Sequence, residues 1–586
     1  MKYLFLFVSS AFFFFISIIS YGQNREEMTI KSVPVAVPVM SPEEAEKANI
    51  EAIKETSKKT VSGTIITISH TISPETAAYD NCNFVLVLRS DSGAEYVITV
   101  PMFINRQFTP FALLKEGTPL NVIIIPYEET SKEIQEIQTI DDINDFERDM
   151  YYAEEIDEDS NSGILFIDPE KREIWLKSLL QETELQLSKY ETVVGNNQDE
   201  REKEIAKFRK KGFQAIQKPY GYFVQSNFFI ETTHYNPTLL HGLIDLFEKC
   251  KAFHTELIVI PCISMPEYSY KELIKSLNDF PFVDYGREKL VYDCLKNGIL
   301  ALDTNSIILN HQSEDYIPYS LLGDSHFSTT TNIFIADEIA TNLGLKKNEY
   351  KIKKDYFKLN SMHIPFYSGP SIVQTDPVFE KQLPKRDQGM TPIIVAGDSF
   401  TTTNSFHSFM SSMTMCDVMS IRHDARANIT LKELLEGKYD SNLQKSSLVV
   451  FIFCSPYMTA NFPTKDLIES QALIKTQKGY SIPISGSQKS VVIQRPDSFI
   501  KTESLKAIID TTPIIAKYQI QINDSKTVFD YDCNFRYNGG DNSFLLDIEP
   551  DDFIDGKVKL SIDGNASFKT VILVDPSNHD ETQGEE

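Results

Sequence analysis

Apolar residues recur in two different patterns along the chain, and the alternation between these patterns predicts its domains. From Val61 to about Thr139, short runs rich in Val and Ile are separated by polar or glycine-containing turns, as in β-strands. Between residues 220 and 480, continuous apolar runs alternate with amphipathic helical stretches. After Pro483 the short β-like runs return. We therefore expect an α/β domain between two β domains.

The central segment predicts a mostly parallel sheet covered by helices on both faces. Strands buried on both faces are apolar throughout, and parallel strands need crossover connections, which are usually helical. In such sheets a site lies beyond the C-terminal ends of the strands. The expected strands are ELIVIPC (256–262), NGILALD near 298–303, TPIIVAG (391–397), CDVMSI (416–421) and SLVVFIFC (447–454).

Polar stretches divide the chain of 586 residues further. The first β domain is expected to be a small barrel of the five-stranded kind that binds oligosaccharides or oligonucleotides, although a purely structural module fits equally well. The second is expected to be a sandwich, with carbohydrate binding as one role. The expected segments are 1–22 (signal), 23–58 (polar tether), 59–140 (β-barrel), 141–215 (acidic linker and a connector of two helices), 216–480 (α/β domain), 485–575 (β-sandwich) and 576–586 (disordered tail).

The N-terminus has the pattern of a secretory signal. Lys2 precedes an apolar stretch over 4–19, and the small residues Ser20 and Gly22 lie before an expected cleavage point at Gln23. An uncleaved membrane anchor is the alternative, but the run is shorter than the ~20 residues that span a bilayer. We expect a mature protein outside the cytoplasm, in the periplasm or cell envelope.

Composition excludes several classes of partner. The formal net charge of −26 argues against nucleic acid, because affinity for phosphates comes mainly from Lys and Arg. The ten histidines and seven cysteines form no H-E-x-x-H motif or Cys/His cluster, so neither a metal nor a cofactor is expected. The cysteines can form one or two disulfides, but Cys262 and Cys454 lie in apolar runs typical of buried thiols.

A candidate nucleophile follows the strand PIIVA. In Gly397-Asp398-Ser399-Phe400, a strand–turn–helix would present the Ser399 hydroxyl at the strand's C-terminal end, where backbone N–H groups can hold an oxyanion. The alternative is an ordinary turn in which Asp398 or Ser399 caps a helix.

A candidate base lies in Asp324-Ser325-His326, just before the helix-like stretch IFIADEIATNL. A serine nucleophile needs a nearby base, and the base needs a carboxylate that fixes its tautomer. Asp324 and His326 can supply both from one loop, although a capped loop is again the alternative. His423, followed by Asp424, is a rival base, whereas His407 lies two turns into the helix after Ser399.

Taken together, the motifs resemble the SGNH-hydrolase-like alginate O-acetyltransferases of the AlgJ and AlgX type. In that family an Asp-x-His motif precedes a Gly-Asp-Ser-Phe motif, and this chain has DSHF at 324–327 and GDSF at 397–400. The flanking stretches YGYFVQSNFF, ELIVIPCISMPEYSY and SLVVFIFCSPYM also resemble the family, over residues 215–475. The chain departs from the pattern where Phe327 replaces a Trp.

The resemblance implies an SGNH-like domain in which Ser399 carries the acyl group, His326 is the general base and Asp324 orients it. Tyr457 matches a tyrosine that lines the acceptor pocket. Asp398 is a further candidate for the oxyanion or substrate-binding set. Arg422 and Arg426, after the next strand, can anchor an anionic acceptor, or can be solvated surface residues.

The expected function is transfer of an acetyl group through an acyl-enzyme to sugar hydroxyls of an exopolysaccharide. The resemblance implies that a membrane-bound acyltransferase partner supplies the acetyl group. Two alternatives remain open: a carbohydrate acetylesterase, in which water replaces the sugar, and a glycan-binding scaffold without turnover.

Overall fold

The structure is a computed structural model, and all of the residues that it describes belong to the unit Lys58–Glu586. The predicted signal, nearly all of the tether and the tail lie outside them. No helix in the described part of the chain is long and apolar enough to cross a membrane. The described residues are 58–72, 74, 77–90, 92–145, 147–154, 156, 165–194, 203, 207, 210, 213–216, 222–225, 234–263, 285–311, 316, 318, 326–357, 372–381, 392–424, 426–475, 479–497, 504–512, 516–533 and 543–574.

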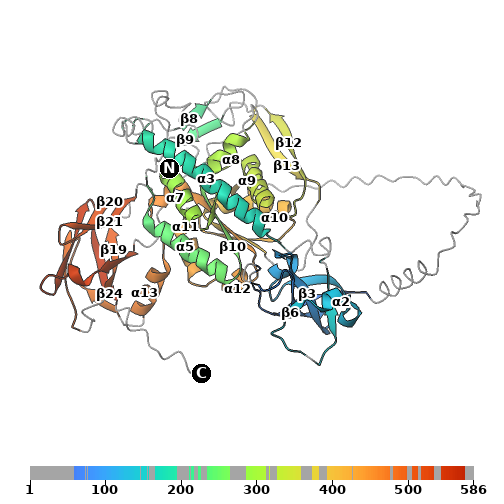
Figure 1. Cartoon of the computed structure of the whole chain (residues 1–586). Helices are drawn as coiled ribbons and strands as arrows, with labels where there is room; N and C mark the ends of the chain where they lie inside the picture. The colour runs from blue at the N-terminus through green and yellow to red at the C-terminus, as the bar shows by residue number, and fades with distance from the viewer. Residues whose placement is uncertain are drawn as a thin grey trace, which may run out of the picture. The chain divides into compact units, whose positions relative to one another are not determined.

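The first β domain is a closed five-stranded barrel (Figure 1). β1 pairs antiparallel with β2 and β5, β2 pairs with β3, and β7 closes the barrel by pairing parallel to β3 and antiparallel to β5. Two short strands and one helix are added to it. The elements are β1 (Lys59–Ile68), β2 (Cys82–Ser90), β3 (Glu95–Ile104), β4 (Gln107–Phe108), β5 (Pro119–Pro126), α2 (Lys132–Gln135), β6 (Gln138–Ile140) and β7 (Met150–Tyr152).

The closing strand β7 lies within the segment that the sequence predicts as an acidic linker. Its three residues, Met150 to Tyr152, are too few to show the two-residue alternation of a strand, and acidic residues surround them. The barrel therefore extends beyond the predicted boundary at residue 140.

The connector contains one long helix, α3 (Pro169–Val194). Trp175, the single tryptophan of the chain, is buried on this helix against the core of the α/β domain. The second predicted helix, over 201–211, lies mostly outside the described residues. The ribbon of β8 (Phe213–Ile216) and β9 (Tyr222–Gln225) follows.

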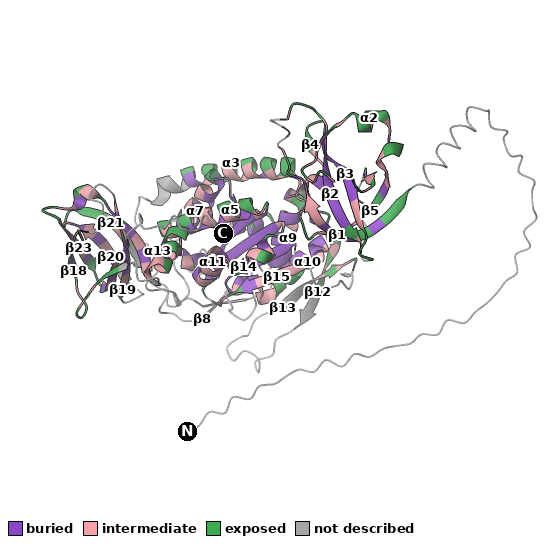
Figure 2. Ribbon diagram, turned by 90° about the horizontal axis from the view of Figure 1, so that it is seen from below, coloured by how far each residue is buried: buried purple, intermediate pink, exposed green. Residues whose placement is uncertain are grey.

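The α/β domain is built on a five-stranded sheet in the order β11-β10-β16-β14-β15. Every neighbouring pair is parallel, and Figure 2 shows the central strands buried. Four of the five predicted runs contain one strand each, and the fifth, 416–421, contains all of β15 but its last residue, which confirms the prediction of a parallel sheet. The strands are β10 (Glu256–Cys262), β11 (Leu300–Ala301), β14 (Ile393–Gly397), β15 (Val418–Arg422) and β16 (Leu448–Cys454).

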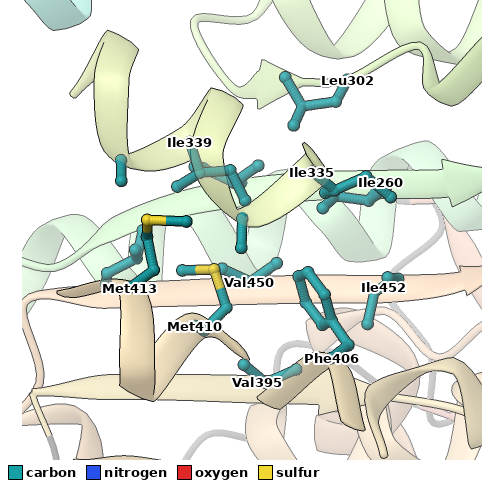
Figure 3. Close-up of a cluster of buried hydrophobic side chains, with 14 of the residues drawn as sticks. Ile260, Leu302, Ile335, Ile339, Val395, Phe406, Met410, Met413, Val450 and Ile452 are labelled. Carbon is teal, nitrogen blue, oxygen red and sulfur yellow. The ribbon is translucent and has the colours of Figure 1, made fainter. Parts of the chain in front are cut away.

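Successive residues of each strand enter two separate cores. In β10, Leu257 and Val259 pack with the helices on one face of the sheet and belong to the first core. Ile258 and Ile260 pack with the helices on the other face and belong to the second core. Figure 3 shows Met410 of α10 in the second core. The first core is covered by α5 (Pro237–Ala252), α7 (Tyr285–Lys296), α11 (Ala427–Leu435) and α12 (Asp440–Leu443), and the second by α8 (Thr304–Asn310), α9 (Thr329–Asn342) and α10 (Phe406–Thr414). The domain is therefore a three-layer α/β structure.

An antiparallel ribbon is inserted between α9 and β14. It consists of β12 (Tyr350–Phe357) and β13 (Ile372–Phe379).

The C-terminal domain is a sandwich of two four-stranded antiparallel sheets around one apolar core. Its first strand begins at Gly479, so the sandwich starts slightly before the predicted boundary at residue 485. One sheet, with α13 (Lys465–Lys475) packed on it, contains β17 (Gly479–Ile482), β24 (Ser567–Val574), β19 (Leu505–Thr512) and β22 (Ser543–Ile548); the other contains β18 (Ser490–Gln494), β23 (Lys557–Gly564), β20 (Ala516–Ile522) and β21 (Lys526–Cys533).

Candidate active site

The turn that carries Ser399 begins at the C-terminal end of β14. Gly397 has a φ of 143°, and a Cβ atom built on it would lie 1.8 Å from the carbonyl oxygen of Ile452. Only glycine allows β14 and β16 to approach so closely here. Ser399 then opens the short 3-10 helix Ser399–Thr401, which places its hydroxyl at the C-terminal edge of the sheet.

Asp398 lies fully buried beneath this turn. One carboxylate oxygen accepts the N–H of Phe400 at 2.9 Å, and the other accepts the N–H of Cys454 at 2.9 Å. Burial raises the pKa of Asp398 to about 6, although the two N–H groups and nearby His326 oppose the rise.

Asp398 was expected among the oxyanion or substrate-binding residues, and its position corrects that expectation. The carboxylate is fully buried and its two oxygens accept backbone N–H groups, which favours a structural role in the turn over a place in the oxyanion or substrate-binding set. Its role is to fix the shape of the turn and to tie the turn to β16.

His326 reaches the same edge from the segment that leads into α9. The Ser328 side chain caps α9 by accepting the N–H of Thr331. Phe327 is fully buried, and its ring packs edge-on against Phe400 with centroids 5.2 Å apart. These contacts bring His326 beside the turn that carries Ser399 (residues 397–402), which we call the nucleophile turn.

The imidazole Nε2 of His326 lies 2.7 Å from the Oγ of Ser399. The two predicted motifs therefore meet in space although 73 positions separate them. With its proton on Nδ1, His326 can accept the serine proton as the hydroxyl attacks an ester or acyl donor. Asp324, the predicted orienting carboxylate, lies outside the described residues.

One backbone donor beside the nucleophilic oxygen is a candidate for stabilising an oxyanion. The N–H of Phe400 is engaged by Asp398, whereas the N–H of Ser399 has no partner within the part of the chain that the structure describes. A donor that precedes the nucleophilic oxygen in the same residue can point at the charge that develops on a bound carbonyl.

The three other predicted binding residues take different positions. Arg422 pairs with Gly397 across β14 and β15, donates to Thr402 Oγ1 in the nucleophile turn and is half exposed. Arg426 is exposed at the start of α11. Tyr457 follows the end of β16, half-buried against both cores.

The rival histidines are engaged elsewhere. His423 Nε2 lies 2.9 Å from Glu433 Oε2 in α11, and Asp424 pairs with Arg422 at 3.2 Å rather than with His423. His407 Nε2 lies 3.2 Å from the Oγ of the neighbouring Ser408. Of the histidines considered as bases, His326 is the one that reaches Ser399.

Two asparagines join the His326 and Ser399 segments, and the sequence prediction missed both. Asn404 donates to the carbonyl of Phe327, and Asn332 donates to the carbonyls of Thr403 and Asn404. One feature of the sequence could have indicated Asn332, because it is a polar residue beside the apolar run IFIADEIA of α9. No such feature indicated Asn404.

Among the described residues, no group of three or more His, Cys, Asp or Glu side chains lies close enough to hold a metal ion.

Comparisons with known proteins give weak matches. No protein-family description matches the chain, and no curated protein sequence matches it. Similar solved structures include AlgX of Pseudomonas aeruginosa (12% identity, TM-score 0.32, covering 62% of this chain and 91% of that one). They also include the O-acetyltransferase domain of Pseudomonas putida AlgJ (12%, 0.31, 45% and 99%) and Bacillus cereus PatB1 (10%, 0.28, 42% and 97%). TM-scores this low assign no activity by themselves.

Proposed function

We propose that this chain is an exported serine O-acyltransferase that moves an acetyl group onto hydroxyls of a polysaccharide. The observation that carries the proposal is the 2.7 Å contact between His326 Nε2 and Ser399 Oγ at the C-terminal edge of a parallel sheet. This arrangement activates a serine for nucleophilic attack. The sequence and order of the DSHF and GDSF motifs support an SGNH-like O-acetyltransferase in particular.

The reaction has two halves that use the same two side chains. Ser399 Oγ attacks the acetyl carbonyl of the donor while His326 Nε2 takes the serine proton, and Asp324 is proposed to orient the imidazole. The donor's leaving group departs with that proton, which leaves Ser399 acetylated. A sugar hydroxyl then attacks the acetyl group, gives its proton to His326 and releases Ser399, which regains the proton.

The acceptor distinguishes transfer from hydrolysis. If water takes the place of the sugar in the second half, the same residues make the protein an acetylesterase. Arg422 beside the nucleophile turn supports an acceptor with anionic groups, and we assign Arg426 and Tyr457 to the same acceptor region. The barrel and the sandwich are proposed to bind the polymer.

The compartment and the donor are part of the proposal. The N-terminal signal pattern supports a location outside the cytoplasm, where a membrane-bound acyltransferase partner would supply the acetyl group. No nucleic acid, metal or cofactor takes part.

The decisive experiment is turnover of an aryl acetate by wild type and Ser399→Ala, with and without an oligosaccharide acceptor. Wild type should release the aryl alcohol, acquire the mass of one acetyl group on Ser399, and turn over faster with the acceptor. Ser399→Ala should do none of these.

Each contrary result has a clear meaning. Equal rates for the two proteins would overturn the assignment of Ser399, and the glycan-binding scaffold would be favoured if both rates were no higher than the uncatalysed rate. Turnover that depends on Ser399 but never acetylates an acceptor would favour the esterase.

A further inference from the structure

The segments that carry His326 and Ser399 are joined at a second point. The side-chain Nδ2 of Asn404 donates a hydrogen bond to the backbone carbonyl of Phe327. Phe327 follows His326 directly, and Asn404 lies five positions after Ser399. The contact between His326 and Ser399 and the hydrogen bond from Asn404 to Phe327 therefore join the same two segments at two points.

Asn332 in the first turn of α9 holds Asn404 in turn. Its Nδ2 donates to the carbonyl of Thr403 at 3.3 Å and to the carbonyl of Asn404 at 3.1 Å. Asn332 is only 2% exposed, so these hydrogen bonds are shielded from water. We call the hydrogen bonds that Asn404 and Asn332 donate the clamp. Because α9 directly follows the His326 segment, Asn332 attaches this clamp to a helix.

The backbone at this point has an uncommon conformation. Asn404 has φ 52° and ψ 30°, and Ser405 has φ 65° and ψ 28°, so two consecutive residues other than glycine are left-handed. Asparagine tolerates this region better than most residues. Such conformations persist where the surrounding contacts determine them, and they cluster at functional sites.

We propose that Asn404, held by Asn332, is a positioning residue that sets the distance between His326 Nε2 and Ser399 Oγ. The inference rests on the proposed function, because it concerns the efficiency of the same proton transfer. A base on the segment before α9 needs a contact that stops it from moving away from the serine. The amide of Asn404 provides that contact through the Phe327 carbonyl, without touching the substrate.

Asn404→Gly tests the proposal without breaking the fold. Glycine adopts the left-handed backbone freely but has no amide, so the clamp is lost while the turn is kept. We expect kcat for an aryl acetate to fall by up to ~100-fold with KM nearly unchanged, as for a misplaced catalytic group. The melting temperature should fall only slightly, because the easier left-handed backbone of glycine partly offsets the lost hydrogen bond to the Phe327 carbonyl. Asn404→Asp should lose the same activity, because a carboxylate cannot donate to the carbonyl.

Ser405→Gly is the matched control. Ser405 shares the left-handed backbone, is exposed and makes no capping hydrogen bond through its side chain. This variant should keep wild-type turnover. A comparable loss in Ser405→Gly would show that the turn's backbone, rather than the amide of Asn404, controls the rate, and would overturn the proposal.

A double-mutant cycle with His326→Ala separates positioning from general destabilisation. If Asn404 acts through His326, adding Asn404→Gly to His326→Ala should cause no further loss of kcat. Multiplied losses would overturn the positioning role.

The failure of this inference can be told apart from the failure of the proposed function. Wild-type turnover in Asn404→Gly, beside inactive Ser399→Ala and His326→Ala, would refute only the clamp. Full activity of Ser399→Ala would refute the proposed function itself.

Discussion

His326 Nε2 and Ser399 Oγ lie 2.7 Å apart, although their segments enter the site from opposite ends of different elements. His326 precedes the helix α9, whereas Ser399 follows the strand β14. Neither motif is specific by itself, since each fits a capped turn. Residues that only capped two separate helices would not need to meet at one edge of the sheet, as His326 and Ser399 do.

The role of His326 predicts a selective effect of substitution. His326→Ala should lower kcat/KM for an aryl acetate by ~10²- to 10⁴-fold, which is the usual contribution of a general base. His423→Ala is the control, because the imidazole of His423 is engaged by Glu433. It should stay near the wild-type rate. If the two variants were equally impaired, the base would not be His326 alone.

Gly397 predicts a large loss of stability on substitution. In Gly397→Ala the new Cβ would lie 1.8 Å from the Ile452 carbonyl oxygen at a φ of 143°. Because that neighbour is backbone in the middle of the sheet, we expect a loss of ~3 kcal/mol or more in the free energy of unfolding. Denaturant titration measures it.

Gly93→Ala is the matched control for Gly397→Ala. Gly93 also has a positive φ, of 87°, but nothing lies within 4 Å of its added Cβ. This substitution should cost only ~1 kcal/mol, the penalty of the backbone conformation alone. Equal losses at the two positions would mean that β14 and β16 can move apart without penalty.

Local patterns were sufficient to predict the sheet and the two reacting side chains. The run of β16 is apolar at every position and that of β10 at every position after Glu256, a pattern typical of strands buried on both faces. Local patterns did not predict the features that depend on three-dimensional contacts. The left-handed conformation of Asn404 leaves no mark in the surrounding sequence, and β7 is too short to show a period.

The same limit applies to the charged residues of the site. From the sequence, Asp324-Ser325-His326 is the preferred base with its carboxylate, but His423-Asp424 stays open as a rival. The structure separates them because Glu433 approaches His423 from the next helix and Arg422 takes Asp424. The buried position of Asp398 likewise depends on β16, whose Cys454 N–H it accepts.

The ion pair of Arg172 and Glu256 predicts that α3 stabilises the α/β domain. Arg172 donates to both carboxylate oxygens, at 2.9 and 3.1 Å, and to the Gly298 carbonyl at 2.6 Å. Both side chains are 16% exposed. Arg172→Ala should therefore lower the unfolding free energy by ~2–3 kcal/mol, because Glu256 loses its partner away from water.

Lys177→Ala is the control for that ion pair. Lys177 pairs with Glu173 at 3.2 Å on the same helix, but the two side chains are 69% and 50% exposed. Its removal should change stability by less than ~0.5 kcal/mol. A loss as large as that of Arg172→Ala would show that the partial burial of the Arg172–Glu256 pair is not what makes it stabilising.

The cysteines predict slow reaction of the native protein with thiol reagents. Cys82, Cys250, Cys262, Cys294, Cys416 and Cys454 are buried free thiols, so the disulfides that the sequence left open are not formed among them. Burial raises the pKa of Cys250 to about 12, and thiolate is the reactive form. A chromogenic aromatic disulfide should react fully only after unfolding. The test uses Cys533→Ser, since the Cys533 side chain lies outside the described part; rapid native labelling would contradict the burial.

Asp398 predicts a specific pH dependence of stability. Burial raises its pKa from the ordinary 3.8 to about 6, so between these values the folded state binds more protons than the unfolded state. This contribution to stability is fully present below pH ~4 and is lost as the pH rises through about 6, a change of ~3 kcal/mol. Asp398→Asn removes the titration. The NH₂ of the new amide faces the N–H of Phe400 or Cys454, as the O–H of the protonated carboxyl does in wild type, so Asp398→Asn is a neutral reference that does not change with pH.

The measurement is the difference in unfolding free energy between wild type and Asp398→Asn at several pH values from 4 to 7. Because the other carboxyl groups are common to both proteins, their titration cancels in the difference. The unfolding free energy of wild type should fall progressively relative to that of Asp398→Asn as the pH rises through the window between the two pKa values of Asp398. A constant difference would mean that the backbone N–H groups of Phe400 and Cys454 outweigh burial and keep the carboxylate ionised, and the raised pKa would then be wrong.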